Sequence, residues 1–290
     1  MCALPSFANE SRPNPLAFPF VLFAATLMLL PSSLAAAPPA SQPEDANQLA
    51  REVVWNELHA QRTDHSYWRY HETRVENGRR ELLDVFQTRD GEIHRLLAVD
   101  GHPLTQNQIA AENSRIENLL SDPSKVADAT KKRQDDIRQE QTLLKMLPDA
   151  FIFHWAGQDG DTVKLRFVPN PAFHPTSHAS EVFHHMEGFM LVDARMKRLV
   201  EIDGRLTTRV NFFGGILGHL DAGGTFCVKQ RDVGGGHWDT TLLDVHMDGR
   251  ALFFKTIAVR ENETYSGYHR VSGDTTLREA AQFLQHDSAG

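Results

Sequence analysis

The feature that most constrains the fold is a long series of short apolar segments separated by turns, over residues 151–271. Its clearest part is 189–206, where two apolar segments flank a polar turn at 193–197. Glycine clusters or Asp-Gly pairs separate most of the later segments, at 225–233, 238–246, 251–260 and 264–271. Short segments bounded by such turns are typical of antiparallel strands joined by hairpins.

A second series of strands is predicted nearer the N-terminus. Residues 67–75 alternate in strand fashion and end at Asn77-Gly78, a dipeptide that favours a tight hairpin turn. The segments 82–88 and 92–99 flank Arg89-Asp90-Gly91 and predict a further hairpin. Together the two series predict about 9–11 strands in a mostly antiparallel sheet.

Helices are predicted at three places. Residues 44–61 form an amphipathic helix with apolar residues on one face, and residues 105–120 and 123–147 are charged and free of glycine. The middle of the last segment, 131–136, is polar on every side, and Pro148 is expected to close it. We therefore expect a single α+β domain over 44–275, with a helical insert at 103–148 that covers the sheet and a C-terminal tail at 276–290.

The N-terminal residues resemble an export signal. An apolar run at 16–30 is followed by Pro31 and by the small residues that end at Ala37. We expect residues 1–37 to be a cleaved signal peptide, 38–43 a short linker, and the protein to be periplasmic or otherwise exported. The alternative is an uncleaved N-terminal anchor, but the run is short for a spanning helix. No transmembrane segment is expected in the mature chain.

The charge balance argues against a nucleic-acid partner. The chain carries 30 basic and 38 acidic residues, a net charge of −8. A nucleic-acid-binding protein needs a basic face that displaces counterions from phosphates. We therefore expect no nucleic acid among the partners.

Histidines supply the one candidate metal site. Four of the 15 histidines lie close together in sequence, at His174, His178, His184 and His185, with Glu187 beside them. Imidazoles and a carboxylate can bind zinc or copper. However, Pro175 makes a helix with His174 and His178 on one face improbable, and neither His-Glu-x-x-His nor a Cys pair is present. A solvated histidine-rich loop is the preferred interpretation, and we expect no metal and no cofactor.

Motifs for other enzyme classes are not found. The glycine clusters 214–218, 223–224 and 234–236 are not followed by the Lys-Ser/Thr of a phosphate-binding loop, and no Gly-x-Ser-x-Gly occurs. We expect no catalytic residues and a protein that is not an enzyme.

The order of elements resembles a known family. A helix, a strand meander, a helical cover and a longer meander behind a signal peptide resemble the periplasmic lipoprotein-sorting carrier superfamily. The stretch 189–206 is most like these carriers, and the combination of 96–104 with 167–173 looks like an exported bacterial branch of the superfamily. The resemblance covers most of residues 44–271 in pattern. It implies a strongly curved sheet that forms a half-open β-barrel covered by helices.

The resemblance further implies a concave apolar sheet face that holds an acyl chain. The candidate lining residues lie on apolar strand faces: Phe189, Leu191, Val200, Ile202, Leu206, Phe226 and Val228. The alternative is that these residues pack against the helices as ordinary core, since an antiparallel sheet commonly has one such face.

Three functional hypotheses follow. The first is an exported envelope protein that binds or carries an apolar ligand, such as a lipid or a lipoprotein acyl chain. The second is a cell-envelope interaction module, without enzymatic activity, that docks a protein partner through the helical segment 121–147. The third and least favoured is a metalloenzyme that uses the histidine-rich loop.

Overall fold

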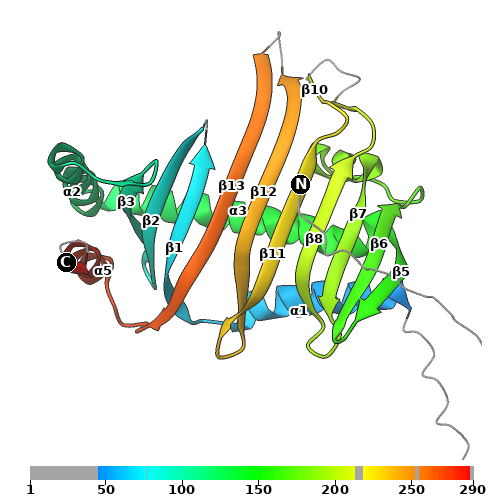
Figure 1. Ribbon diagram of the computed structural model, residues 1–290, viewed down its shortest axis with the longest axis horizontal. Helices are drawn as coiled ribbons and strands as arrows, with labels where there is room; N and C mark the ends of the chain where they lie inside the picture. The colour runs from blue at the N-terminus through cyan, green and yellow to red at the C-terminus, as the bar shows by residue number, and fades with distance from the viewer. Residues whose placement is uncertain (1–44, 77, 213–217, 252–254, 288–290) are drawn as a thin grey trace, which may run out of the picture. The chain divides into compact units, whose positions relative to one another are not determined.

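The computed structural model describes residues 45–76, 78–212, 218–251 and 255–287. The predictions for the signal peptide, 1–37, and the linker, 38–43, lie outside the described residues. The described residues form an α+β fold with one large antiparallel sheet (Figure 1). The helices are α1 Ala46–Thr63, α2 Gln106–Leu120, α3 Pro123–Ala150, α4 His178–Glu181 and α5 Leu277–Asp287, with a 3-10 turn, η1, at Val182–His185.

Thirteen strands form the sheet within the described residues. Those before α2 are β1 Tyr67–Glu76, β2 Arg79–Thr88, β3 Gly91–Val99 and β4 His102–Pro103. Those after α3 are β5 Phe151–Asp159, β6 Thr162–Pro169, β7 Met186–Asp193, β8 Arg198–Leu206, β9 Val210–Phe212, β10 Gly218–Leu220, β11 Thr225–Gly234, β12 His237–Ala251 and β13 Lys255–Val271.

The strand order places the first meander beside the last strand. It reads β4-β3-β2-β1-β13-β12-β11-β8-β7-β6-β5, and the short strands β9 and β10 pair with each other and with β12 off this path. The pairing of β1 with β13 runs from Tyr67–Val271 to Val75–Asn262. Because β4 and β5 end the order without pairing to each other, the sheet is not closed into a barrel.

The structure corrects the strand count of 9–11 to 13. Three strands of two or three residues, β4, β9 and β10, are too short to give an alternating pattern. In addition, residues 255–260 and 264–271, which were expected in two strands, lie in one strand, β13, which has 17 residues. Its polar middle continues the pairing, because Asn262 and Glu263 lie opposite Asp244 and Leu243 of β12.

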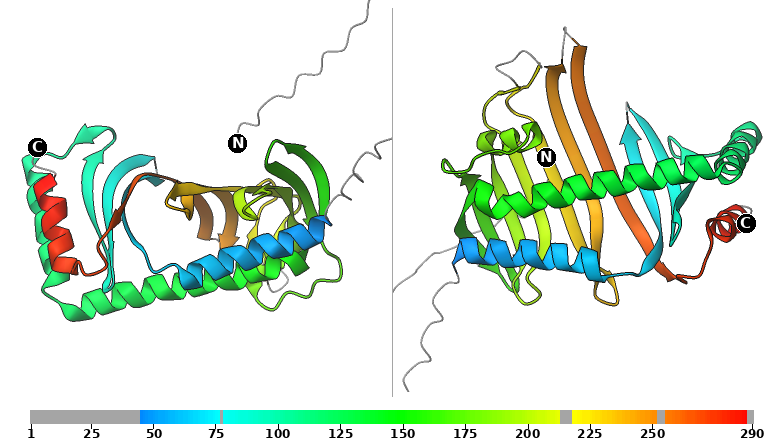
Figure 2. Two further views of the ribbon diagram at one scale, coloured as in Figure 1. Left: turned by 90° about the horizontal axis from the view of Figure 1, so that it is seen from below. Right: turned by 180° about the vertical axis from the view of Figure 1, so that it is seen from behind.

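Helices α1 and α3 cross one face of the sheet. Figure 2, in the view from behind, shows α3 running from the β5 side of the sheet to α2, with α1 beside it. Asp45 caps α1 by accepting a hydrogen bond from Asn47 N, and Leu49 and Val53 on its inner face are at most 1% exposed. Pro148 does not end α3, which continues to Ala150. Since Pro148 lies in the last turn, its missing N–H interrupts the helix only near its end.

The segment expected as a C-terminal tail, 276–290, contains helix α5. Its Ala280, Ala281 and Leu284 are buried against Phe86 and Ile93 of the first meander. A larger cluster lies between α1 and strands β5 to β8, and a third joins β1, β2 and β13. Strand β2 is therefore covered on both faces, which explains its run of buried residues at 83–86.

Candidate functional site

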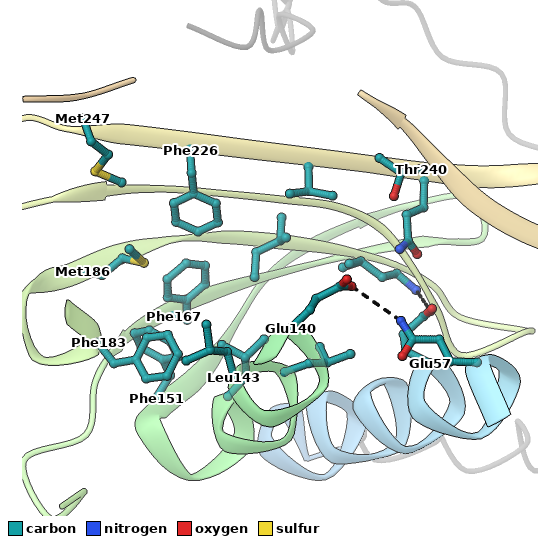
Figure 3. Close-up of a pocket in the computed structure, with 17 residues that line it drawn as sticks. Glu57, Glu140, Leu143, Phe151, Phe167, Phe183, Met186, Phe226, Thr240 and Met247 are labelled. Atoms are coloured by element: carbon teal, nitrogen blue, oxygen red, sulfur yellow. Dashed lines mark hydrogen bonds between the residues drawn. The ribbon is translucent and has the colours of Figure 1, made fainter. Parts of the chain in front are cut away.

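A cavity lies between the sheet and the two helices that cross it. Its volume is about 340 Å³, and most of the surface that lines it is apolar. Figure 3 shows Phe226 and Met186 on the sheet side and Leu143 on the helix side. The lining residues are Glu57, Gln61, Glu140, Leu143, Leu144, Leu147, Phe151, Phe167, Phe183, Met186, Leu199, Ile202, Phe226, Val228, Gln230, Thr240 and Met247.

Strand β11 supplies the middle of the sheet wall. Phe226, Val228 and Gln230 alternate along it and so face the cavity on one side of the sheet. A register shift in the β11–β12 pairing, where Gln230 lies opposite Thr240, places one extra residue in β12. This irregularity allows both Thr240 and Met247 to face the cavity, although they are seven positions apart in the same strand.

A row of aromatic residues and glycines crosses four strands behind the cavity. Phe167 of β6 pairs with Gly188 of β7, which pairs with Gly204 of β8, which pairs with Phe226 of β11. A Cβ atom on Gly188 would lie 2.7 Å from the Phe167 ring, and one on Gly204 would lie 2.4 Å from the Phe226 ring. The two glycines therefore make room for both rings, because a side chain at either position would collide with the ring beside it.

Helix α1 is fixed to the sheet by a buried ion pair at the edge of the cavity. The Glu57 carboxylate accepts hydrogen bonds from Arg198 Nε at 2.8 Å and Nη2 at 2.9 Å, and from the Leu199 backbone N–H at 2.9 Å. The two side chains are only 5% and 12% exposed. Because its oxygens are occupied by these donors, Glu57 acts as an anchor of the helix rather than as a group free to bind a ligand.

Polar residues gather at one end of the cavity. Figure 3 shows Glu57, Glu140 and Thr240 together on the side away from Phe183 and Met186. Gln61 Nε2 lies 3.5 Å from Glu140 Oε1 across the two helices. Glu140 is exposed on the helix surface, yet its carboxylate lies at the cavity mouth, where desolvation raises its pKa above the ordinary value.

One atom at this polar end has no partner. In the part of the chain that the structure describes, Gln230 Oε1 is the buried side-chain oxygen or nitrogen that makes no hydrogen bond. Buried polar atoms in native proteins are normally hydrogen-bonded, and an orphan costs free energy. Apart from the polar residues at this end, the walls of the cavity are mostly apolar.

The predicted lining residues fall into two groups. Ile202, Phe226 and Val228 line the cavity, and Leu206 is buried in the adjoining core cluster. Phe189 and Leu191 are instead paired with Arg166 and Lys164, on the opposite sheet face from the buried Met190 and Val192. The Lys164 ammonium lies 4.1 Å from the centre of the Phe189 ring there.

The remaining predicted residue, Val200, lies at a register shift. Leu191 pairs with Glu201 and Val192 with Leu199, which leaves Val200 between the two pairs. Sequence analysis did not assign to the cavity the helix residues that line it. Leu143, Leu144 and Leu147 of α3 line the cavity, and which strands these leucines cover depends on how the helix packs.

The described side chains of the histidine-rich segment do not gather around one point. His174 is exposed in a loop, His184 lies near the Phe173 ring, and His185 Nδ1 is 2.6 Å from Thr208 Oγ1. The side chain of His178 lies outside the described residues. The described residues hold no group of three or more His, Cys, Asp or Glu arranged to bind a metal ion.

A second, more polar hollow of about 390 Å³ lies at the turn between β11 and β12. There His237 Nδ1 contacts Asp64 Oδ2 at 2.5 Å, and its Nε2 lies 3.3 Å from Asp239 Oδ2. The His237 ring stacks on Trp68 with centroids 4.5 Å apart. Burial alone would lower the pKa of His237, but the hydrogen bonds to Asp239 and Asp64 raise it above its ordinary value. This arrangement ties the end of α1 to the sheet.

Comparisons with known proteins add no functional assignment. No protein-family model matches the chain, and neither a curated protein nor a solved structure matches it. A search of the described helices for one that is long and apolar enough to cross a bilayer finds none.

Proposed function

We propose that this chain is an exported envelope protein that binds or carries an apolar ligand, such as a lipid or a lipoprotein acyl chain. The observation that carries the proposal is the apolar cavity between the sheet and helices α1 and α3. Its volume of about 340 Å³ lies in the range of small-molecule sites, and its apolar walls end in a few polar groups. The proposal includes a half-open, strongly curved barrel like that of the lipoprotein-sorting carriers.

Burial of an alkyl chain supplies a driving force for such binding without a specific polar contact. A chain of about fourteen methylenes gains roughly 11 kcal/mol at ~0.8 kcal/mol per buried CH₂. Association costs of about 4–15 kcal/mol offset much of this gain. Affinity in the micromolar range or weaker is therefore expected for a purely apolar ligand.

Native mass spectrometry of the protein, isolated from cell envelopes without detergent, tests the proposal. We expect an added mass that matches a lipid or acylated species and that organic solvent releases. Val228→Trp, which places a large ring in the cavity, should abolish this mass. Leu191→Trp is the matched control, because Leu191 lies on the opposite face of the sheet. A mass without any adduct, before and after adding lipid, would contradict the proposal.

We propose further that residues 1–37 direct export and are removed. N-terminal sequencing of the protein from a periplasmic extract tests this part. A first residue at or near Pro38 is expected, and an intact Met1 in a membrane pellet would favour the anchor instead.

A second function is favoured by the exposure of helix α3. Residues 131–140, in the middle of α3, are all exposed. Ile137 among them is 38% exposed. An interaction module would dock an envelope protein through this part of 121–147. Ile137→Asp should then abolish co-purification of one defined protein without changing the lipid adduct.

A further inference from the structure

The two ends of the open sheet are places where another strand could add. Among the described strands, β5 forms one end of the sheet, and β3 with the two-residue strand β4 forms the other. Backbone N–H and C=O groups along such an edge can pair with a strand of a second molecule. Figure 1 shows the start of α1 near β5 and α2 beside β3. Each helix therefore begins or lies where an added strand would pair.

At the β5 edge, the Asn47 side chain bonds to the backbone of one residue. Phe153 N donates to Asn47 Oδ1 at 2.9 Å, and Asn47 Nδ2 donates to Phe153 O at 3.4 Å. In an antiparallel sheet, two opposite residues exchange the same two bonds. Because a side-chain amide has both an acceptor and a donor, Asn47 of α1 takes the place of one residue of an adjacent antiparallel strand.

The edge is interrupted on both sides of Phe153. Before it, Phe151 N donates to Leu147 O in the last turn of α3. After it, the pairing of β5 with β6 has a register shift between Trp155 and Gly157, where Gly157 has a φ of 147°. Such an irregularity bends a strand and breaks the regular row of groups that an added strand needs.

At the β3 edge, an ion pair of α2 bonds to the backbone in a similar way. Leu96 N donates to Glu112 Oε1 at 2.9 Å, and Arg115 Nη2 donates to His94 O at 2.6 Å. Arg115 also donates to both Glu112 oxygens, at 2.8 Å and 2.7 Å, which holds the two side chains together. The pair thus supplies one acceptor and one donor to two outward-facing backbone groups of the edge.

The chemistry of this second edge favours a permanent contact. The Glu112 side chain is 8% exposed. Burial alone would raise the pKa of Glu112, but the hydrogen bonds from Arg115 and from Leu96 N lower it below its ordinary value, so the carboxylate keeps its charge at neutral pH. Next to this contact, β4 covers Ala98 with Pro103, which has no N–H to offer a further strand.

We propose that Asn47 at one edge, and Glu112 with Arg115 at the other, close the sheet against pairing with the sheet edge of a second copy of this chain. Each set of side chains bonds to the backbone groups that the second copy would use. The inference concerns the sheet edges alone and does not depend on whether the cavity binds an apolar ligand.

Sedimentation velocity of the protein isolated from cell envelopes tests the inference. Asn47→Ala and Glu112→Ala should each self-associate at a concentration about tenfold lower than the unaltered chain, as expected when two backbone groups become free to pair. Gln48→Ala and Glu117→Ala are the matched controls, since both residues are exposed on the same two helices. If Glu112→Ala does not fold, Arg115→Ala, whose side chain is 40% exposed in the unaltered chain, tests the same edge.

Hydrogen exchange separates edge pairing from association caused by unfolding. The Phe153 amide should be protected in the unaltered chain, lose protection in monomeric Asn47→Ala and regain it in the associated form, while circular dichroism stays unchanged. The inference is overturned if folded variants at both edges associate no more readily than the unaltered chain. It is also overturned if the controls associate equally, or if Asn47→Ala associates without renewed protection at Phe153.

Discussion

The ion pair between Glu57 and Arg198 shows how one side chain positions a helix over the cavity. Glu57 accepts three hydrogen bonds from the first two residues of β8, so a single carboxylate joins α1 to the sheet. Removing one partner of a buried pair leaves the other charge uncompensated. Glu57 therefore contributes both to the stability of the fold and to the position of α1 beside the cavity.

Glu57→Ala should lower the free energy of unfolding by about 3–5 kcal/mol. The reason is that Arg198, only 12% exposed, would keep its charge without a carboxylate. Urea unfolding measures the change, with Glu52→Ala as the control. Glu52 contacts Lys197 at 3.8 Å on a more exposed part of the same helix, so its loss should cost about 1 kcal/mol or less. Equal losses for the two variants would contradict the assigned role of Glu57.

At the scale of single residues, the sequence predicted strands that line the cavity, but only some of the predicted residues lie on the sheet face that borders it. Residues 189–192 are apolar at every position, so alternation alone does not say which pair is buried. The neighbouring strands decide this, because Lys164, Arg166, Glu201 and Asp203 pair with Leu191 and Phe189 and make that face polar. The orphan acceptor Gln230 could not be foreseen, since it depends on the packing of two strands and two helices.

At the scale of whole elements, helix α5 was not predicted from the sequence. Residues 276–290 were expected to be a tail, yet three residues of α5 are buried with Phe86 and Ile93. The other elements were easier to predict where the pattern is long, as in α2 and α3. The fusion of two expected strands into β13 was missed because its polar middle is stabilised by pairing rather than by burial.

Leu284→Ala should lower the free energy of unfolding by about 2–5 kcal/mol, because the side chain is fully buried in the cluster with Ile93 and Ile116. The adjacent Phe283 provides the control. It is 53% exposed and only stacks on Phe86, so Phe283→Ala should cost at most about 1.5 kcal/mol. Thermal or urea unfolding gives both values, and similar costs would show that α5 does not pack as described.

At the scale of the whole molecule, acidic groups meet where β1 lies beside β13. Desolvation, together with the charge of Glu263, raises the pKa of Glu72 to about 7. Tyr265 donates a hydrogen bond to Glu263 beside it. The same face also carries Glu92, whose pKa is raised by desolvation. These groups lie near the place where the N-terminal meander pairs with the rest of the sheet.

The raised pKa of Glu72 predicts a loss of stability with rising pH. The native state holds this proton up to about pH 7, whereas the unfolded chain releases it near the ordinary value of 4.5. Stability is therefore greatest below that value and falls as the pH rises through 7. Urea midpoints at about pH 5 and pH 8 measure the slope. Glu72→Gln should flatten it and Glu52→Gln should not, and an unchanged slope in Glu72→Gln would refute the assignment.

The pairing of β1 with β13 also sets an order of events in time. Strands β5 to β8 follow one another both in sequence and in the sheet, so they can assemble from short loops. Strand β1 must instead wait for its partner, since Tyr67 lies opposite Val271. Closing so long a loop is entropically costly and slows folding. Strand β1 therefore completes its pairing with the later strands only after β13 has been made, whereas strands β5 to β8 can pair before it.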